Sequence, residues 1–255
     1  MPEILELELT RRGVASAIGR RVHAVERTDP LVVAEGVDIE IVGSIITGLD
    51  RVGKQLVVFT DGPTVGVHLG MTGRLFVDDV STIGELAYGA GSDAPRWDRW
   101  MLALSGDTRL RLHDPRRFAR VVLDPDLTRL GPDALSLRRR ELAAALSGRK
   151  APVKAVLLDQ HAIAGLGNML VDEVLWSCGL DPRRVAGGLT DDDTTNLHRT
   201  IRRRLAVMMR RGGSHTGRLS PAVRAPGGVC ARDGTPLART VVGGRTTVWC
   251  PEHQH

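Results

Sequence analysis

Apolar residues recur at two different spacings in two successive parts of this 255-residue chain. From Arg21 to about Asp124 they form short or alternating runs separated by glycine and aspartate turns, whereas from about residue 137 to 210 they recur at helical spacing. A period of two residues indicates strands, and a period near 3.6 indicates helices. The sequence therefore predicts an α+β fold, in which an antiparallel sandwich or barrel precedes a helical part.

The expected elements can be placed along the chain. Residues 2–19 predict an amphipathic helix that ends at Gly19. Apolar or alternating runs predict strands at residues 38–42, 55–59, 65–68 and 100–104. Helical spacing predicts helices near residues 138–147, 152–161, 168–178 and 191–211, the last with an arginine-rich face. A boundary is expected at residues 130–133, a linker at 212–229 and a small hairpin-like tail at 230–255.

The composition limits the class of protein. The formal charge is +5 and the pI about 9.7, which favours an anionic partner, although an arginine bias can equally reflect genome composition. Only Lys54, Lys150 and Lys154 are lysines. The acidic N-terminus has no apolar signal region and no apolar run reaches membrane length, so we expect neither secretion nor membrane insertion. Three cysteines make no disulfide framework, which fits a reducing cytoplasm.

The chain opens with a proline followed by two acids. Removal of Met1 would give Pro2 a free secondary amine, with Glu3 and Glu6 within about one helical turn. An amine that titrates near neutrality can attack a carbon bearing a leaving group, and a carboxylate can move the protons. The alternative is an ordinary helix start, in which proline and acids occupy the first turn.

Four residues of metal-ligating types lie in the tail at zinc-ribbon spacing. Cys230 and Asp233 form one pair and Cys250 and His253 the other, each with two intervening residues. Aspartate stands where a second cysteine is usual, and its oxygen binds zinc less firmly than thiolate does. We expect one structural zinc ion, because 26 residues have little core of their own; the alternative is a hairpin without zinc.

Four further turn-forming segments can approach a ligand. Gly243-Gly244-Arg245 at a hairpin tip could reach a phosphate, and residues 164–168 could hold one at a helix N-terminus or simply connect two helices. The turns at residues 68–73 and 114–118 carry Met71 and Phe118 beside arginines. Such side chains are usually satellite core, but they can also wedge into a stack of bases.

Together these motifs resemble the formamidopyrimidine-DNA glycosylase family, which includes the bacterial MutM and endonuclease VIII-type enzymes. The resemblance runs nearly end to end. It comprises Pro2-Glu3 with Glu6, Gly53-Lys54, residues 68–73, 114–118, 130–132, 158–160 and 164–168, and the Cys/His tail around Gly243-Gly244-Arg245.

The resemblance implies a bifunctional DNA glycosylase and lyase. Pro2 would attack C1′ of a damaged nucleotide and the imine would allow β- and δ-elimination, with Glu3 as the main proton shuttle and Glu6 in support. Lys54, Asn168 and Arg245 would hold the phosphates. Met71, Arg116 and Phe118 would fill the gap left by the flipped nucleotide. The full set of implied DNA-binding residues is His68, Met71, Arg116, Arg117, Phe118, Arg149 and Asn168.

The implied architecture has three domains. They are an N-terminal helix with a two-layer β-sandwich (residues 1–125), a helix-two-turn-helix domain (126–215), and a linker with a zinc hairpin (216–255). The partner would be double-stranded DNA with oxidised bases or abasic sites, bound by a cytoplasmic monomer.

Three departures from the family pattern bear on the expected activity. Leu5 replaces a usual proline, Asp233 replaces a usual cysteine, and the stretch from Gly212 to Cys230 is short for a loop that caps 8-oxoguanine. We therefore expect 8-oxoguanine not to be the best substrate. Two rival functions stay open, namely a catalytically silent binder of damaged DNA with the same fold and a zinc-ribbon RNA- or ribosome-binding protein.

Overall fold

The structure is a computed structural model that describes residues 2–81, 83–84 and 92–255. The described residues form two units. One contains Pro2 and Glu6–Thr128, and the other contains Glu3–Leu5 and Arg129–His255. The second unit thus includes a tripeptide from the start of the chain.

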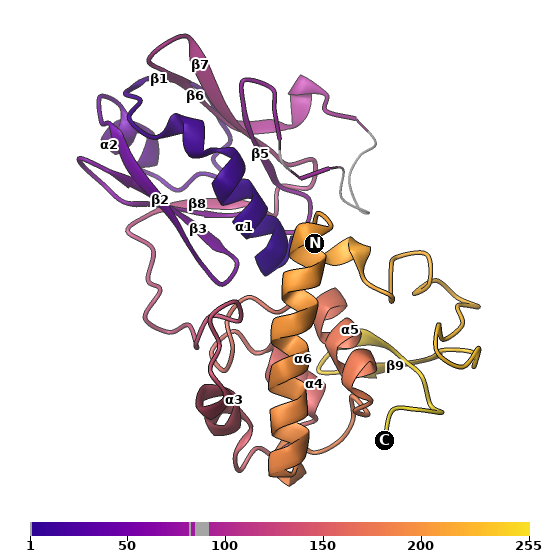
Figure 1. Cartoon of the computed structure of the whole chain (residues 1–255). Helices are drawn as coiled ribbons and strands as arrows, with labels where there is room; N and C mark the ends of the chain where they lie inside the picture. Colours follow the sequence, from indigo (N-terminus) through magenta and orange to yellow (C-terminus); the bar gives the residue numbers. More distant parts are fainter. Residues whose placement is uncertain (1, 82, 85–91) are drawn as a thin grey trace. The chain divides into compact units, whose positions relative to one another are not determined.

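Two four-stranded antiparallel sheets make up most of the first unit (Figure 1). Their orders are β1-β6-β7-β5 and β2-β3-β4-β8. The strands are β1 (Val22–Thr28), β2 (Ile46–Val52), β3 (Gln55–Thr60), β4 (Val65–His68), β5 (Arg74–Val77), β6 (Asp98–Leu104), β7 (Thr108–His113) and β8 (Arg120–Leu123). Leu56 and Val67 of one sheet share an apolar core with Leu102 and Leu112 of the other. The predicted two-layer sandwich is therefore confirmed.

The first helix is shorter than the sequence suggested. Helix α1 spans Ile4–Gly13, and a 3-10 turn (η1, Ala15–Ala17) replaces its predicted continuation to residue 19. Gly13 breaks the helix because glycine in a helix costs backbone entropy.

One predicted strand is wrong. The alternating run at residues 38–42 lies mostly in a short helix, α2 (Val37–Ile41). Val37 and Ile41 are buried one turn apart, whereas Ile39 is 80% exposed. The apolar residue at position 37 completes a helical pattern, i to i+4, which the apparent alternation of the next four residues hides.

Helices form the greater part of the second unit. They are α3 (Arg139–Leu146), α4 (Val153–Leu158), α5 (Asn168–Cys178) and α6 (Asp191–Arg210), at or inside the predicted positions. Helix α6 begins with a capping box, in which the side chains of Thr190 and Asp193 each accept a hydrogen bond from the other residue's backbone amide. Short 3-10 turns complete the helical elements at η2 (Pro95–Trp97, in the first unit), η3 (Ala186–Gly188) and η4 (Ser214–Thr216).

The tail forms the predicted hairpin, from β9 (Ala238–Val242) and β10 (Arg245–Trp249). A small apolar cluster joins the tail to helix α5, where Trp176 packs with Leu219, Cys230 and Cys250. Residues 212–229 contain only the turn η4, yet Leu219 is 2% exposed. This segment is therefore built into the unit instead of being a free linker. The bounds of the three predicted domains stay a prediction.

Among the residues that the structure describes, no helix combines the length and the apolar character needed to cross a membrane.

Candidate functional site

The carboxylate of Glu3 occupies the N-terminus of helix α5. Its two oxygens accept hydrogen bonds from the backbone amides of Gly167 (2.9 Å), Met169 (2.9 Å) and Leu170 (3.1 Å). Glu3 is 1% exposed. Amide donors and the positive end of a helix dipole both stabilise a carboxylate in its charged form, so the Glu3 side chain is fixed in place.

Glycines make this arrangement possible. A Cβ atom at position 167 would lie 2.3 Å from the Glu3 carboxyl carbon, and one at position 165 would lie 2.4 Å from the Ile4 side chain. The Gly165-Leu166-Gly167 motif thus admits the N-terminal residues to the start of α5. The sequence suggested that the amides of residues 164–168 could bind a phosphate. In the structure the Glu3 carboxylate accepts hydrogen bonds from three amides at this helix start, so these amides are not open to a phosphate.

Asn168 stands beside this capped terminus. Its amide Nδ2 donates to the carbonyl oxygen of Thr246 at 2.9 Å, one residue after Arg245. Arg245 itself is exposed and follows a tight turn at Gly243-Gly244, where φ is +58° and +70°. Positive φ at both turn positions is the geometry of a two-residue hairpin loop, which favours glycine. The structure therefore brings Glu3, Asn168 and the Arg245 hairpin together in one unit.

Arg149 lies in the same unit, in the exposed connection between α3 and α4. Its backbone carbonyl accepts a hydrogen bond from Gly187 at 2.9 Å.

The other two residues of the N-terminal motif, Pro2 and Glu6, belong to the first unit. Pro2 is buried and immediately precedes Glu3, while Glu6 is 3% exposed in the first turn of α1. Two residues further on, Glu8 forms ion pairs with Arg11 and Arg12, both at 2.8 Å.

Lys54 and His68 lie close to each other in the sandwich. Lys54 is in the turn between β2 and β3, and its neighbour Gln55 pairs with His68 across β3 and β4. Burial lowers the pKa of His68, and the positive charges of Lys54 and Arg120 lower it further. His68 is therefore a neutral acceptor, and its Nδ1 takes a hydrogen bond from the amide of Gly70 at 3.0 Å.

The two turns that carry Met71 and Phe118 pack against each other. A Cβ atom at Gly70 would lie 2.4 Å from the Phe118 backbone, so the close approach requires glycine. Asp114 organises both turns, because its carboxylate accepts hydrogen bonds from the hydroxyl of Thr72 and the amides of Arg116 and Ala119.

The side chains at this turn pair protrude in part. Phe118 is 45% exposed, with the Arg116 guanidinium 4.9 Å from the centre of its ring. Arg117 has a positive φ of +56° and donates to the Asp29 carboxylate at 2.7 Å. An exposed aromatic ring with an arginine over it is available for stacking, unlike a satellite core residue.

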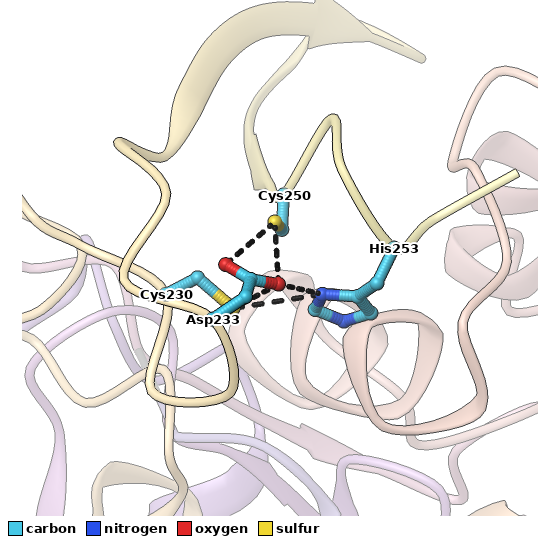
Figure 2. A group of neighbouring side chains, drawn as sticks. All are labelled: Cys230, Asp233, Cys250 and His253. Carbon is cyan, nitrogen blue, oxygen red and sulfur yellow. Dashed lines mark hydrogen bonds and ion pairs between the residues drawn. The ribbon is translucent and has the colours of Figure 1, made fainter.

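The predicted metal ligands converge in the tail, as Figure 2 shows. Cys230 and Asp233 precede β9, Cys250 follows β10, and His253 lies in the final turn. One ligand atom from each residue lies within 4.8 Å of all the others. The cluster could hold a metal ion, and its distances test this.

The distances fit a tetrahedral ion. Zinc bonds of about 2.3 Å to sulfur and about 2.0 Å to nitrogen or oxygen place neighbouring ligand atoms about 3.5 Å apart. The Cys230 Sγ atom is 3.5 Å from His253 Nδ1 and 3.5 Å from Asp233 Oδ2, and Cys250 Sγ is also 3.5 Å from that oxygen. The donor set is therefore preorganised for a small divalent ion.

Trp176 of α5 supports the cluster from outside. Its carbonyl oxygen lies 3.2 Å from Nε2 of His253, and its indole Nε1 donates to the Cys230 sulfur at 3.3 Å. A histidine that donates its other N–H to a carbonyl presents the remaining nitrogen as a ligand. No sequence pattern points to Trp176, because the supporting contact spans 54 residues.

The sequence also missed the buried charges of helix α5. Asp172 and Glu173 are each 1% exposed and pair with Lys154 and Arg204, respectively. Of the four residues in these two ion pairs, the sequence analysis singles out only Lys154, as one of the three lysines of the chain. An apolar helix sequence does not show which basic residue will reach its acids.

Comparison with known proteins gives consistent matches along the chain. Residues 1–121 match the model of the formamidopyrimidine-DNA glycosylase N-terminal domain, and residues 130–219 match that of the formamidopyrimidine-DNA glycosylase H2TH domain. A formamidopyrimidine-DNA glycosylase of Moorella thermoacetica is 36% identical, over 98% of this chain and 91% of the relative. One of Acidithiobacillus ferrooxidans is 33% identical over the full length of both.

Solved structures of formamidopyrimidine-DNA glycosylases have a similar fold. A Lactococcus lactis FPG mutant in complex with a Fapy-dG containing DNA has a TM-score of 0.84 and 25% identity over all of both chains. A MutM complex with carbocyclic 8-oxo-G containing DNA has a TM-score of 0.82 and 26% identity, again over all of both chains. The two domain models in order, together with full-length relatives above 30% identity, show that this chain belongs to the formamidopyrimidine-DNA glycosylase family.

Proposed function

We propose that this protein is a bifunctional DNA glycosylase and abasic-site lyase that removes oxidised bases from double-stranded DNA. The observation that carries the proposal is the Glu3 carboxylate, which is held by three amides directly after Pro2. Relatives over the whole chain are named formamidopyrimidine-DNA glycosylases, and structural neighbours were solved with oxidised-base or abasic DNA.

The Pro2 amine is the nucleophile once Met1 is removed. It attacks C1′ of the damaged nucleotide, the bond from C1′ to the base breaks, and the base leaves with a proton. Opening of the sugar ring gives an imine to the proline nitrogen. Loss of the C2′ proton then expels the 3′-phosphate, and a second elimination expels the 5′-phosphate. Glu3 moves the protons, with Glu6 in a supporting role.

Exposed and partly exposed side chains bind the DNA. Lys54, Asn168 and Arg245 hold the phosphates around the flipped nucleotide, and Arg149, His68 and Arg117 add contacts to the backbone. Met71, Arg116 and Phe118 fill the space left in the base stack. Flipping costs a few kcal/mol, which inserted side chains partly offset.

Zinc is the metal that best suits the tail cluster. Two thiolates and one imidazole are ligands that zinc prefers, and a four-ligand closed set is typical of structural sites. Cys230, Asp233, Cys250 and His253 would hold it, and it would supply order to the hairpin that carries Arg245. Elemental analysis of protein purified without chelator should give one zinc per chain.

The activity is tested by covalent trapping. Borohydride added with abasic duplex DNA should reduce the imine and link the protein to DNA, and mass spectrometry of the free protein should show a chain that begins at Pro2. A form with a blocked N-terminus should lose both trapping and strand cleavage. Strand cleavage at the normal rate by the blocked form would contradict the proline mechanism.

The Glu3 assignment has its own test. Glu3→Gln should abolish base excision and leave DNA binding nearly unchanged, because an amide cannot exchange protons while the phosphate contacts remain. Glu35→Gln, an exposed site in the first unit, is the matched control and should retain full activity. A protein that binds damaged DNA but never forms the imine would instead be the silent binder of the same fold.

The lesion preference follows from the segment between α6 and the hairpin. Leu219 is buried and its amide donates to Glu173 at 2.8 Å, which leaves little chain to cap a large flipped purine. We expect ring-opened purines, oxidised pyrimidines or abasic sites to be processed faster than 8-oxoguanine opposite cytosine. Single-turnover excision on matched duplexes compares them. We also expect the protein to act in the cytoplasm as a monomer.

A further inference from the structure

A single buried carboxylate joins three segments of the second unit. Asp172 of α5 lies 2.7 Å from Lys154 Nζ of α4 and 2.7 Å from an Arg224 nitrogen, and it accepts a hydrogen bond from the Val248 amide of β10 at 3.1 Å. Its side chain is fully buried. One acid therefore fixes a helix, the 212–229 segment and the hairpin strand.

The same network holds the strand immediately after Arg245. Lys154 donates to the carbonyl oxygen of Thr246 at 3.0 Å, the oxygen that also accepts from Asn168. Asp172 holds the Val248 amide as well. Thr246 and Val248, two residues apart on β10, are therefore both hydrogen-bonded to helices α4 and α5. The chain before Arg245 also lies close to α4, because a Cβ atom at Gly243 would be only 3.1 Å from the Ala155 side chain.

Arg224 is the distant member of this network. Its side chain is 11% exposed, and it lies in the part of the 212–229 segment that follows the turn η4. That segment has a second anchor one residue along α5, where Glu173 accepts the Leu219 amide at 2.8 Å and pairs with Arg204. Two adjacent acids of α5 thus hold the segment at two points.

We propose that Arg224 and Asp172 are positioning residues for Arg245, so that the 212–229 segment determines where the hairpin presents its phosphate-binding side chain. The proposal rests on the phosphate role given to Arg245 above. Arg224 acts at a distance: it neutralises Asp172, and Asp172 holds β10. A buried carboxylate that loses one partner re-pairs or admits water, which loosens its remaining contacts.

A double-mutant cycle tests the proposal. The variants are Arg224→Ala, Arg245→Ala and the double variant, with Arg218→Ala as the matched control. Arg218 lies in the same segment and carries the same charge, but it is exposed. The readout is equilibrium binding to a duplex that contains a tetrahydrofuran abasic-site analogue, measured at several salt concentrations.

Arg224→Ala should weaken binding several-fold, and Arg218→Ala should change it by less than that. The double variant should bind within about twofold of Arg245→Ala, because residues that act through one another are not additive. Hydrogen exchange of the Val248 amide should speed up in Arg224→Ala and not in Arg218→Ala. Arg224→Lys, which keeps the charge, should recover part of the affinity.

Other outcomes separate the two proposals. If Arg245→Ala alone leaves affinity and salt slope unchanged, its phosphate role fails. If Arg245→Ala weakens binding but the Arg224→Ala effect adds to it in full, or is absent, only the positioning role is overturned. Zinc content and the denaturation midpoint of each variant show whether it has folded. Should Arg224→Ala fail to fold, Arg224→Gln replaces it in the cycle.

Discussion

Asp114 and Asp172 each hold an element proposed to contact DNA, but they do so with different partners. Asp114 accepts one hydroxyl and two backbone amides, all from residues within its own pair of turns. Asp172 pairs with two cations and one amide from three segments that are distant in sequence. Both side chains are buried, so neither charge is compensated by water.

The difference shows two ways to stabilise a protruding element. The hydrogen-bond donors to the Asp114 carboxylate are neutral groups of its own two turns, and the buried Arg99 interacts with that carboxylate only through its charge, so these turns depend on few other residues. The charged donors around Asp172 are themselves buried, and each becomes costly when the acid is lost. Substitution of the acid should therefore destabilise the Asp114 turns of the first unit less than it destabilises the hairpin of the second unit.

Metal removal should produce the largest difference between the two regions. Structural zinc contributes about 10 kcal/mol or more in small zinc-binding peptides. Chelation should release the Cys250 end of β10, raise hydrogen exchange throughout residues 230–255 and abolish DNA binding. The Asp114 turns should keep their protection, and their simultaneous loss would mean that the two regions are not independent.

Removal of each acid's charge compares the two regions directly. Asp172→Asn should lower the free energy of unfolding by about 3–5 kcal/mol, because Lys154 and Arg224 are left buried without a counter-charge. Asp114→Asn should cost about 1–2 kcal/mol, since its hydrogen bonds to neutral donors weaken while the buried Arg99, which loses one nearby negative charge, keeps its ion pair with Asp29. Urea denaturation of both variants measures this; equal losses would contradict the contrast.

The glycine that lets the two turns approach gives a smaller effect. Gly70→Ala should cost about 2–3 kcal/mol, from a positive φ and a clash with the Phe118 backbone. Gly19→Ala is its control, because Gly19 has a φ of +84° with open space around it. That variant should cost only the backbone strain, about 1 kcal/mol. The two variants would lose equal stability if the close approach did not matter.

The smallest effect is a pH dependence confined to the first unit. Burial raises the pKa of Glu8, but hydrogen bonds from Arg11 and Arg12 outweigh it and lower the value from 4.5 to about 2. A lowered pKa stabilises the fold above pH 4.5, and this contribution disappears as the pH falls toward 2. Glu8→Gln should therefore be less stable than the parent at pH 6, by less than about 1 kcal/mol, and equal to it near pH 2. A gap that persists at pH 2 would assign the difference to packing.

The sequence predicted those parts of the fold that depend on local pattern. The helices at residues 139–146, 168–178 and 191–210 follow from apolar spacing and caps, and the hairpin follows from its glycines and paired ligands. Val37–Ile41 was misassigned because a five-residue helix offers too short a window to separate a period of two from one of 3.6.

Long-range pairing could not be read from the chain. Nothing around Arg224 indicates that it reaches a buried acid 52 residues earlier on α5, and the segment's glycines and prolines favoured a linker. Similarly, the motif at residues 164–168 was associated with phosphate binding, whereas its amides hold Glu3. The ligand chemistry was predictable, but the occupant of those amides was not.

The link between Glu3 and the start of α5 also sets an order of events during synthesis. The hydrogen bonds that fix Glu3 join residues 164 to 167 positions apart. A ribosome must therefore complete about two thirds of the chain before the first acid meets its amide partners, long after the sandwich strands have emerged. Glu3, Ile4 and Leu5 should become protected in step with Gly167 and Leu170, which pulse-labelled hydrogen exchange during refolding can follow. A chain that ends before Gly167 therefore cannot hold the Glu3 carboxylate in place, and Glu3 is made early but ordered late.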